Sequence, residues 1–404
     1  MERQLSEIWG SQRIRPVGLV TGDGQNVTVL YPGRLNDGRG GDFCDAVVMV
    51  DGQKVIGDVE LHVTSRDWMG HGHHKDAAYN QVVLHVVWRD TGGATKLQNG
   101  VAIPVLVLQD YVPVEAFNHD GHTNSPEILS SCPCYNVTAR SGEASLAQLL
   151  DEAGDARFEA NAAKIRQQID AAGSEQALYE GIMTALGYSK NKAPFRELAY
   201  RLPLRIIERD VLHTGYDRET LFRHLNSLML QVAGLVVSEP GVNIESMSAG
   251  DWDFFKVRPG NSPVARIGAA AHLLVRYCET GLLQGLLNLV RQAPPVRAEA
   301  YLQAGLLVAG IGRTRVDDII ANVLLPFALV FTPVNGVSYL GDTTLRLYRG
   351  YKRLASNCLE RHMIVQLNLP PCLVNSARRQ QGLLHIYKTM CIQAKCSGCA
   401  LAQP

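Results

Sequence analysis

The chain has 404 residues, of which 46% are hydrophobic and 19% charged, and its formal net charge is zero. This length exceeds that of most single domains, so two or three domains are expected, and the composition is normal for a well-packed soluble protein. No apolar run is long enough to cross a membrane, and the N-terminal segment MERQLSEIWGSQRIRP lacks the apolar core of a signal peptide. We therefore expect a cytoplasmic protein that does not contact a membrane.

The first 120 residues predict a mixed α/β domain. Asp51-Gly52 lies between two apolar runs and predicts a β-hairpin. The segment DAAYNQV (76–82) is predicted to be helical. Apolar segments separated by Gly and Pro are predicted to be strands, and they cover residues 17–35, 45–64, 82–88 and 105–108. Residues 121–150 are predicted to form a linker or loop.

The remaining chain has helical spacing of its apolar residues. One predicted helix places Leu178, Ile182, Met183 and Leu186 on a single face. Similar spacing occurs in residues 203–235, 262–292, 314–331 and 376–391. We expect a helical domain over 151–340 and a basic helical C-terminal segment over 341–404. The predicted fold class is α+β, with an N-terminal α/β unit followed by a large, mostly α-helical region.

Acidic residues share one face of a predicted strand. In DVELHV (58–63) alternate side chains face opposite sides, so Asp58, Glu60 and His62 lie together and the apolar residues face the other way. Asp45 opens the preceding strand of the hairpin. Because a hairpin folds its two strands against each other, we expect Asp45 and Glu60 at the same end and face of a small sheet.

Such carboxylates predict a metal site. Two carboxylates held close together repel each other unless a cation lies between them, and oxygen ligands suit Mg²⁺ or Mn²⁺. We expect Asp45 and Glu60 to bind the metal, Asp42 or Asp58 to assist, and His62 to orient a water molecule. The alternative is that these acidic residues form the solvated face of a half-buried strand.

A histidine-rich segment, HGHHKD, follows this strand. Adjacent histidines in a glycine-containing loop rarely all bind one zinc ion. We instead expect His71 and His74 to contact phosphate or to complete the carboxylate site, with Tyr79 as a supporting hydrogen-bond donor. His85 lies in an apolar strand and is predicted to be a buried core histidine.

This arrangement resembles the PD-(D/E)XK nuclease superfamily. Gly41-Asp42 with Asp45, then Glu60-Leu61-His62, then a helix and a strand follow that family's order. The resemblance implies a restriction-endonuclease-like domain over residues 1–120 and metal-dependent hydrolysis of phosphodiesters. The chain departs from the pattern at His62, where the family has lysine, and the charge of histidine varies near neutral pH.

Longer segments resemble a second family. GGDFCDAVV, GDVELHVTSRDWMGHGHHKDAAYNQVVLHVVW, LYEGIMTALGYSKNKAPF, VRPGNSPVARI and NSARRQQGLLHIY are similar to domain of unknown function 2851, over nearly the whole chain. That family usually has Gly-Pro-Asp-Phe where this chain has Gly40-Gly41-Asp42-Phe43. The resemblance implies no particular activity.

Cysteines gather near the C-terminus. Cys391, Cys396 and Cys399 combine a CxxC pair with a third cysteine five residues upstream, and Cys372 or Cys358 could supply a fourth ligand. Such spacing predicts a zinc site or an iron–sulfur cluster. The alternative is that these cysteines are reduced thiols without a metal.

Basic and amide side chains suggest a nucleic-acid partner. Residues 341–404 carry nine Lys or Arg against Asp342 and Glu360. This imbalance permits contact with DNA or RNA, or simply marks a solvated helical surface. Residues that could contact nucleic acid occur in the segments RPGNSPVARI and NSARRQQG; they are Arg258, Asn261, Arg266, Arg378, Arg379 and Gln381. The alternative is that these side chains form buried structural pairs that hold helices together.

Together these features predict a divalent-metal-dependent nuclease or nuclease-like protein. One alternative is a non-catalytic nucleic-acid-binding or scaffold protein that keeps the fold without turnover, consistent with the missing lysine. Another is a different metal hydrolase centred on the histidines, which would prefer Zn²⁺ or Fe²⁺. The sequence does not indicate an oligomeric state.

Overall fold

The computed structural model describes residues 1–15, 18–36, 38–113, 134, 137–212, 214–237, 244–255, 257–331 and 340–402. The chain forms two compact units. The first unit comprises Met1–Ala153, Ser356–Leu373 and Gly382–Pro404, and the second comprises Gly154–Ala355 and Val374–Gln381. Two of the four boundaries fall inside helices, α5 (Glu143–Ala172) and α17 (Ala377–Thr389), and the segment 341–404 contributes to both units. A sheet together with many helices makes this an α+β protein, as predicted.

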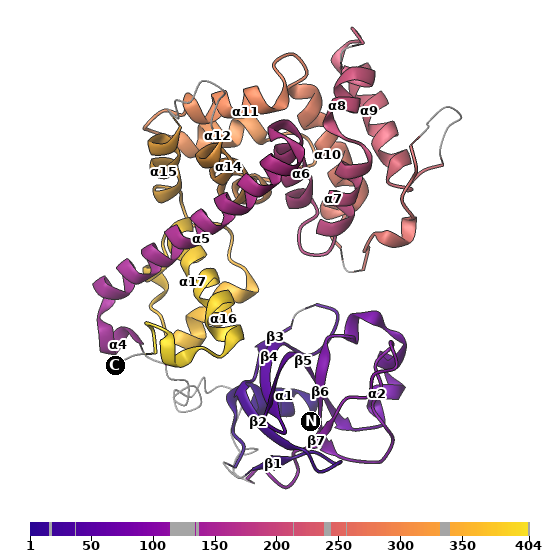
Figure 1. Cartoon of the computed structure of the whole chain (residues 1–404), viewed down its shortest axis with the longest axis vertical. Coiled ribbons are helices and arrows are strands. Elements are labelled where there is room, and N and C mark those ends of the chain that lie inside the picture. The colour runs from indigo at the N-terminus through magenta and orange to yellow at the C-terminus, as the bar shows by residue number, and fades with distance from the viewer. Residues whose placement is uncertain are drawn as a thin grey trace. The chain divides into compact units, whose positions relative to one another are not determined.

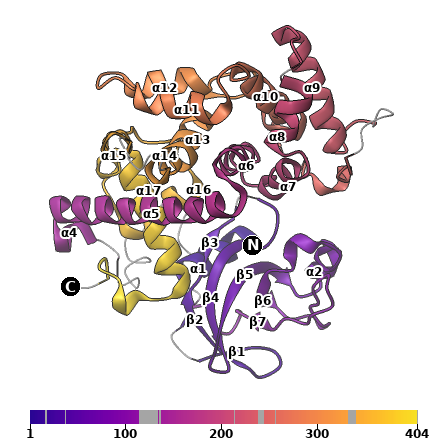
Figure 2. The same cartoon turned by 45° about the horizontal axis from the view of Figure 1, so that its top comes forward.

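The first unit is built on a seven-stranded sheet in the order β1-β2-β4-β5-β6-β7, with β3 paired to β4 (Figures 1 and 2). The strands are β1 (Leu19–Val20), β2 (Asn26–Tyr31), β3 (Arg34–Leu35), β4 (Phe43–Val50), β5 (Gln53–Thr64), β6 (Val82–Arg89) and β7 (Val105–Val107). The β1, β2, β4 and β5 neighbours pair antiparallel, whereas β6 and β7 run parallel to β5. A parallel pair requires a crossover, so the chain between β5 and β6 must leave the sheet and return.

The predicted hairpin is confirmed. Val50 pairs with Gln53, which leaves Asp51 and Gly52 as a two-residue turn between β4 and β5. Both turn residues have positive φ, 47° and 79°. A type I′ turn needs this conformation at both positions, and Asp-Gly adopts it with little strain.

The predicted alternation along β5 is also confirmed. Val59 and Leu61 belong to the apolar core that the sheet forms with Trp9 and its neighbours on α1 (Glu2–Ser11). Glu60 and His62 are buried on the opposite side of the strand. The polar face of β5 is therefore covered rather than solvated, because the crossover after β5 folds over it.

That crossover contains three short helical turns: α2 (Asp67–Gly70) and the 3₁₀ helices η1 (His73–Lys75) and η2 (Ala77–Tyr79). The prediction of a helix over 76–82 is therefore wrong. The Asp76 side chain accepts a hydrogen bond from the Ala78 N–H and so caps only one short turn, and β6 begins at Val82. Side chains of this type favour caps and turns over helix interiors.

The first unit also holds α4 (Val137–Ser141), the start of α5, α16 (Cys358–Leu367), the end of α17, η8 (Pro371–Leu373), η9 (Cys391–Gln393) and η10 (Cys396–Gly398). The C-terminal segment is fixed to the sheet by long-range hydrogen bonds. The Tyr31 hydroxyl lies 2.6 Å from His362 Nε2, and the Tyr387 hydroxyl donates to Asp45 at 3.0 Å. The first unit is thus completed by residues far along the chain.

The second unit is helical. Besides the shared α5 and α17, its α-helices are α6 (Ser174–Leu186), α7 (Lys192–Arg201), α8 (Leu204–Ile207), α9 (Arg218–Val232), α10 (Pro263–Arg276), α11 (Leu282–Arg291), α12 (Ala298–Leu306), α13 (Arg313–Ile319), α14 (Leu325–Val330) and α15 (Gly341–Arg349). Its shorter helical turns are η4 (Glu208–Leu212), η5 (Ala249–Asp251), η6 (Pro259–Asn261) and η7 (Ile320–Leu324). The predicted face of α6 is confirmed, since Leu178, Ile182, Met183 and Leu186 are all buried in the core. Within the described ranges, no helix combines the length and apolar character needed to cross a membrane.

Gly57 offers a test of how closely β5 and β6 pack. A Cβ added there would lie 2.3 Å from Val83 Cγ1 and 2.5 Å from the Gln81 carbonyl oxygen. We expect Gly57→Ala to destabilise the protein by about 2–3 kcal/mol, because backbone must move to relieve the overlap. Gly70→Ala is the control, since nothing lies within 4 Å of the added Cβ. The measurement is urea unfolding monitored by circular dichroism. Equal midpoints for the two variants would contradict the close packing.

Candidate functional site

Glu60 lies near the middle of the sheet and is only 5% exposed. Its Oε2 accepts a hydrogen bond from the backbone N–H of Asp42 at 3.0 Å. Its Oε1 lies 3.1 Å from His73 Nε2 and 3.5 Å from His62 Nε2. One carboxylate oxygen is therefore held by the backbone, and the other faces two imidazole rings.

Asp42 lies beside Glu60, just before β4 begins. The backbone N–H of Leu61 donates to Asp42 Oδ2 at 3.0 Å, so the two carboxylates each bind the other strand's backbone. Burial, and next the nearby charge of Glu60, raise the pKa of Asp42 from 3.8 to about 6. The folded protein thus brings two acidic groups together at a cost in free energy.

A chain of hydrogen-bonded histidines starts at His62. Its Nδ1 lies 2.9 Å from His85 Nε2, and its Nε2 lies 3.0 Å from His71 Nδ1. His85 Nδ1 in turn lies 2.9 Å from the Thr95 hydroxyl. Burial lowers the pKa of His62 to about 3 and that of His85 to about 4, so both rings are neutral at physiological pH. His85 is a buried histidine, as predicted, and it also orients His62.

Aromatic packing fixes the crossover that carries the other histidines. Trp68 is fully buried and its indole N–H donates to the Lys96 carbonyl at 2.8 Å. The His73 ring packs on Tyr79, with 3.8 Å between ring centroids. It also meets Trp68 edge-on. These contacts hold His73 rigidly over Glu60, as a preorganised site requires.

The histidines are close enough to share one ion. One nitrogen each of His62, His71 and His73 lie within 4.8 Å of one another, and His71 is exposed while the other two are buried. In a tetrahedral site, nitrogen ligands about 2.1 Å from a metal lie about 3.4 Å apart. This distance falls between the 3.0 Å that separates His62 from His71 and the 4.8 Å that encloses all three nitrogens. With Glu60, this group offers imidazole and carboxylate donors, which suit Mn²⁺, Zn²⁺ or Fe²⁺ better than Mg²⁺.

Asp45 occupies a different position from the one expected. A β-bulge sets Cys44 and Asp45 of β4 opposite Asp58 of β5, and Asp45 has a positive φ of 61°. The Asp45 carboxylate is bound by Arg34 Nε at 3.2 Å and by the Tyr387 hydroxyl. Its backbone N–H donates to Asp58 at 3.3 Å. The bulge therefore separates the acidic residues into two pairs, and Asp42 rather than Asp45 lies beside Glu60.

The histidine assignments also change. His71 is in the group as expected, but His73 takes the place proposed for His74. Both lie on η1, where successive side chains project about 120° apart, so two adjacent histidines cannot face the same point. Tyr79 lies against His73 and is partly buried, and burial raises the pKa of its hydroxyl to about 12. His73 was missed because sequence spacing alone does not reveal a 3₁₀ turn.

The structure brings some of the predicted cysteine ligands together and leaves others apart. Cys391, Cys396 and Cys399 line one cavity of the first unit, and Cys134 lines it with them. Cys372 is exposed and lies outside that lining. Cys358 lies 3.9 Å from Arg34 Nη1.

One predicted nucleic-acid segment is largely engaged within the second unit. Arg266 is buried, donates to the Gly310 carbonyl at 3.2 Å and hydrogen bonds Asn261. Internal pairing, the alternative that the sequence left open, accounts for Arg266 and Asn261. Arg258 is exposed and stays a predicted contact.

The second predicted segment is engaged in the same way. Arg378 Nε donates to Asp155 Oδ1 at 2.7 Å, and its Nη2 binds the other oxygen of that carboxylate. Gln381 is buried and accepts a hydrogen bond from Arg157. Arg379 is partly buried and stays a predicted contact.

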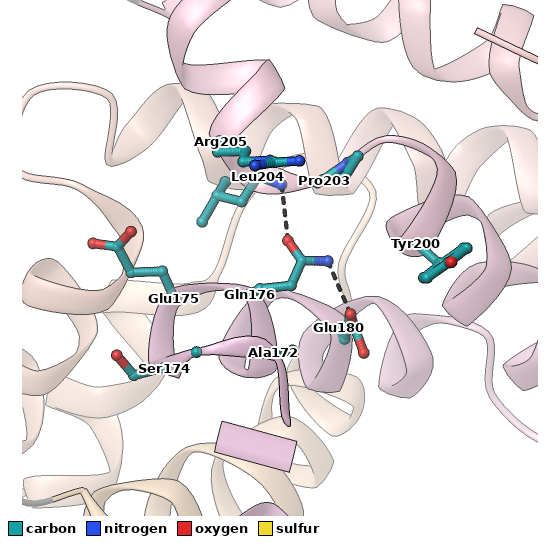
Figure 3. Close-up of a pocket in the computed structure, with 10 residues that line it drawn as sticks. Ala172, Ser174, Glu175, Gln176, Glu180, Tyr200, Pro203, Leu204 and Arg205 are labelled. Atoms are coloured by element: carbon teal, nitrogen blue, oxygen red, sulfur yellow. Dashed lines mark hydrogen bonds between the residues drawn. The ribbon is translucent and has the colours of Figure 1, made fainter. Parts of the chain in front are cut away.

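A pocket of the second unit lies between α6, the end of α7 and α8 (Figure 3). Gln176 spans it: its Oε1 accepts from the Leu204 N–H at 3.0 Å, and its Nε2 donates to Glu180 and to the Ala199 carbonyl. The Gln176 amide therefore links α6 to Ala199 on α7 and to Leu204 at the start of α8. We assign this pocket no chemistry.

Asp42→Asn tests the electrostatics of the carboxylate pair. The raised pKa of Asp42 means that its ionisation costs folding free energy, beginning above its ordinary pKa of 3.8 and complete above about 6. Asparagine keeps an oxygen for the Leu61 N–H but carries no charge. We expect the metal-free variant to unfold about 2–4 °C above wild type at pH 8, with the difference vanishing near pH 4.

The measurement is thermal unfolding in EDTA, followed by circular dichroism. The control is Asp23→Asn, an aspartate of the first unit whose side chain accepts a hydrogen bond from Thr21. An equal gain at both pH values would show that charge repulsion with Glu60 is not the cause.

Comparison with known proteins identifies one family. Residues 2–294 match the family described as protein of unknown function (DUF2851). This match covers most of the chain and ends before NSARRQQGLLHIY. No curated protein and no solved structure matches the chain. The chain belongs to the DUF2851 family.

Proposed function

We propose that this protein is a divalent-metal-dependent nuclease that hydrolyses phosphodiester bonds in DNA or RNA. The observation that carries the proposal is that Glu60 and Asp42 cluster with three histidines at the polar face of β5. Two acidic groups, the neutral imidazole of His62 and the exposed His71 suit a cation that is reached from solvent.

Glu60, His62, His71 and His73 would hold the metal, with Asp42 beside them. A divalent ion bound there would polarise a phosphodiester and lower the pKa of a water molecule. The donor set fits such an ion, since Glu60 Oε1 already faces two imidazole nitrogens. Because most donors are nitrogen, we propose Mn²⁺ over Mg²⁺ as the working metal.

The residues around this group would position the substrate. His85 and Thr95 orient His62, so that its Nε2 faces Glu60 and His71. The hydroxyl of Tyr79, whose pKa burial raises to about 12, carries its proton at physiological pH and could donate to a phosphate oxygen.

The order of elements supports the proposed likeness to the PD-(D/E)XK superfamily. An acidic residue before β4, the β4–β5 hairpin, Glu60-Leu61-His62 and a parallel β6 follow the order that the resemblance implies, whereas the helix implied between the last two is replaced by the short turns α2, η1 and η2. His62 replaces the lysine, and its neutral ring cannot supply the positive charge of an ammonium group. The proposal therefore places that charge on the metal.

A second candidate is a Zn²⁺- or Fe²⁺-dependent hydrolase that acts on another substrate. The three clustered histidines favour it, since imidazole is a common ligand of both metals. The remaining alternative is a non-catalytic nucleic-acid-binding or scaffold protein, which has no need for a metal at Glu60.

Cleavage assays test the proposed activity. Labelled single- and double-stranded DNA and RNA are incubated with Mn²⁺, Mg²⁺, Zn²⁺ or Fe²⁺, and wild type is compared with Glu60→Gln. We expect Mn²⁺-dependent cleavage that falls at least about 100-fold in the variant, because a ligand of the metal is lost. Glu159→Gln, on an exposed face of α5, is the matched control and should retain full activity. Absence of cleavage with every metal would argue against a nuclease.

Metal binding by adjacent histidines gives a separate test. We expect His73→Ala to weaken Mn²⁺ binding at least about 10-fold in calorimetry, because His73 faces Glu60. His74→Ala should change it less than about 2-fold, since the 3₁₀ turn directs that side chain elsewhere. The opposite ranking would place the metal on the other side of η1, and no binding by wild type would favour the scaffold.

A further inference from the structure

Four cysteines line one cavity of the first unit. The cavity has a volume of about 510 Å³, and its lining includes Cys134, Cys391, Cys396 and Cys399. Cys134 and Cys399 are buried, and the other two are partly buried. The lining also contains apolar residues such as Phe43 and Met390, so thiols there are set among apolar walls.

Tight turns bring three of these cysteines to the cavity. Cys391 begins η9, Cys396 begins η10, and Cys399 follows directly. Ala394, between the two 3₁₀ helices, has a positive φ of 47°, which reverses the chain. The Cys399 N–H donates to the Cys396 carbonyl at 3.1 Å. The backbone is therefore folded so that thiols three and five residues apart face one cavity.

Cys134 reaches the same cavity from a distant part of the chain. Just after it, Arg140 on α4 donates to the Leu401 carbonyl at 3.1 Å, and α4 lies near the end of the C-terminal segment in both views (Figures 1 and 2). Gln366 Nε2 lies 3.7 Å from Cys134 Sγ and 3.9 Å from Cys391 Sγ. One amide thus donates toward two sulfurs, and such hydrogen bonds stabilise thiolates that bind metal.

The spacing of the sulfurs distinguishes between kinds of metal centre. Among the described residues, no three of these cysteine sulfurs lie within 4.8 Å of one another. Four thiolates at about 2.3 Å from one zinc ion would lie only about 3.8 Å apart. In an iron–sulfur cluster the cysteines lie farther apart, because the thiolates bind different iron atoms. A cavity whose four thiols do not gather around one point fits the cluster better.

We propose that Cys134, Cys391, Cys396 and Cys399 bind an iron–sulfur cluster. This inference does not rest on the proposed nuclease activity. It replaces the fourth ligand expected from the sequence, Cys372 or Cys358, by Cys134. A cluster there would join the C-terminal turns to the segment that precedes α4.

The test is anaerobic purification of the full chain, with measurement of the visible absorption band, iron, zinc and acid-labile sulfide. We expect wild type to carry iron and sulfide in comparable amounts, either as purified or after reconstitution with ferrous iron and sulfide. Cys134→Ser and Cys396→Ser should lose most of the iron and the visible band. Cys372→Ser is the matched control, because this cysteine is exposed and lies outside the cavity, and it should keep both.

Each contrary result would overturn the proposal. Stoichiometric zinc without iron, or wild type that takes up no iron on reconstitution, would exclude the cluster. Iron retained by Cys134→Ser, or lost by Cys372→Ser, would exclude the assigned ligands. Circular dichroism of each variant shows whether it has folded, and the partly buried Cys396 gives a second variant should the buried Cys134 prove necessary for folding.

Discussion

The carboxylate of Glu60 sets the main physical constraint on the first unit. It is nearly excluded from water and lies beside a second acidic group, Asp42. Burying charge in this way is unfavourable unless an opposite charge compensates it. Among the described residues neither carboxylate forms an ion pair with Lys or Arg. The neighbouring His62 is neutral because its pKa is lowered, and His73 Nε2 lies 3.1 Å from Glu60 Oε1. The proposed cation would add positive charge between Glu60 and these imidazoles.

The bulge in β4 places Asp45 and Asp58 away from Glu60, where they have structural partners. Asp45 is compensated by Arg34 and accepts a hydrogen bond from Tyr387, so it fastens the C-terminal segment to the sheet. Burial raises the pKa of Asp58 to about 6, and this carboxylate accepts the Asp45 N–H. One face of a hairpin therefore carries both an uncompensated pair, suited to a metal, and a compensated pair, suited to a structural role. The alternation of polar and apolar residues in the sequence does not distinguish the pair Asp42 and Glu60 from the pair Asp45 and Asp58.

Local features of the chain were predictable and long-range ones were not. The Asp51-Gly52 turn and the apolar face of α6 follow from residues within one element, and both were predicted. The choice of Asp42 over Asp45 depends on a bulge, which requires knowing the register of two strands. The choice of His73 over His74 depends on a 3₁₀ turn that aromatic packing stabilises. Cys134 could not have been grouped with the C-terminal cysteines, because only tertiary structure brings them together.

Both candidate sites, the Glu60 site and the cysteine-lined cavity, lie in the first unit, which is built from the two ends of the chain. The chain leaves this unit after Ala153 and returns at Ser356, so the unit is completed only when the C-terminal segment has been made. Closing so long a loop costs entropy, and specific contacts must offset it. The Tyr31–His362 and Tyr387–Asp45 hydrogen bonds are such contacts, and burial lowers the pKa of His362 to about 4, so its ring stays neutral. A cluster bound by Cys134 and the C-terminal cysteines would add a covalent-strength link across the same long loop. Its proposed role is therefore to complete the unit that carries the Glu60 site, rather than to take part in hydrolysis.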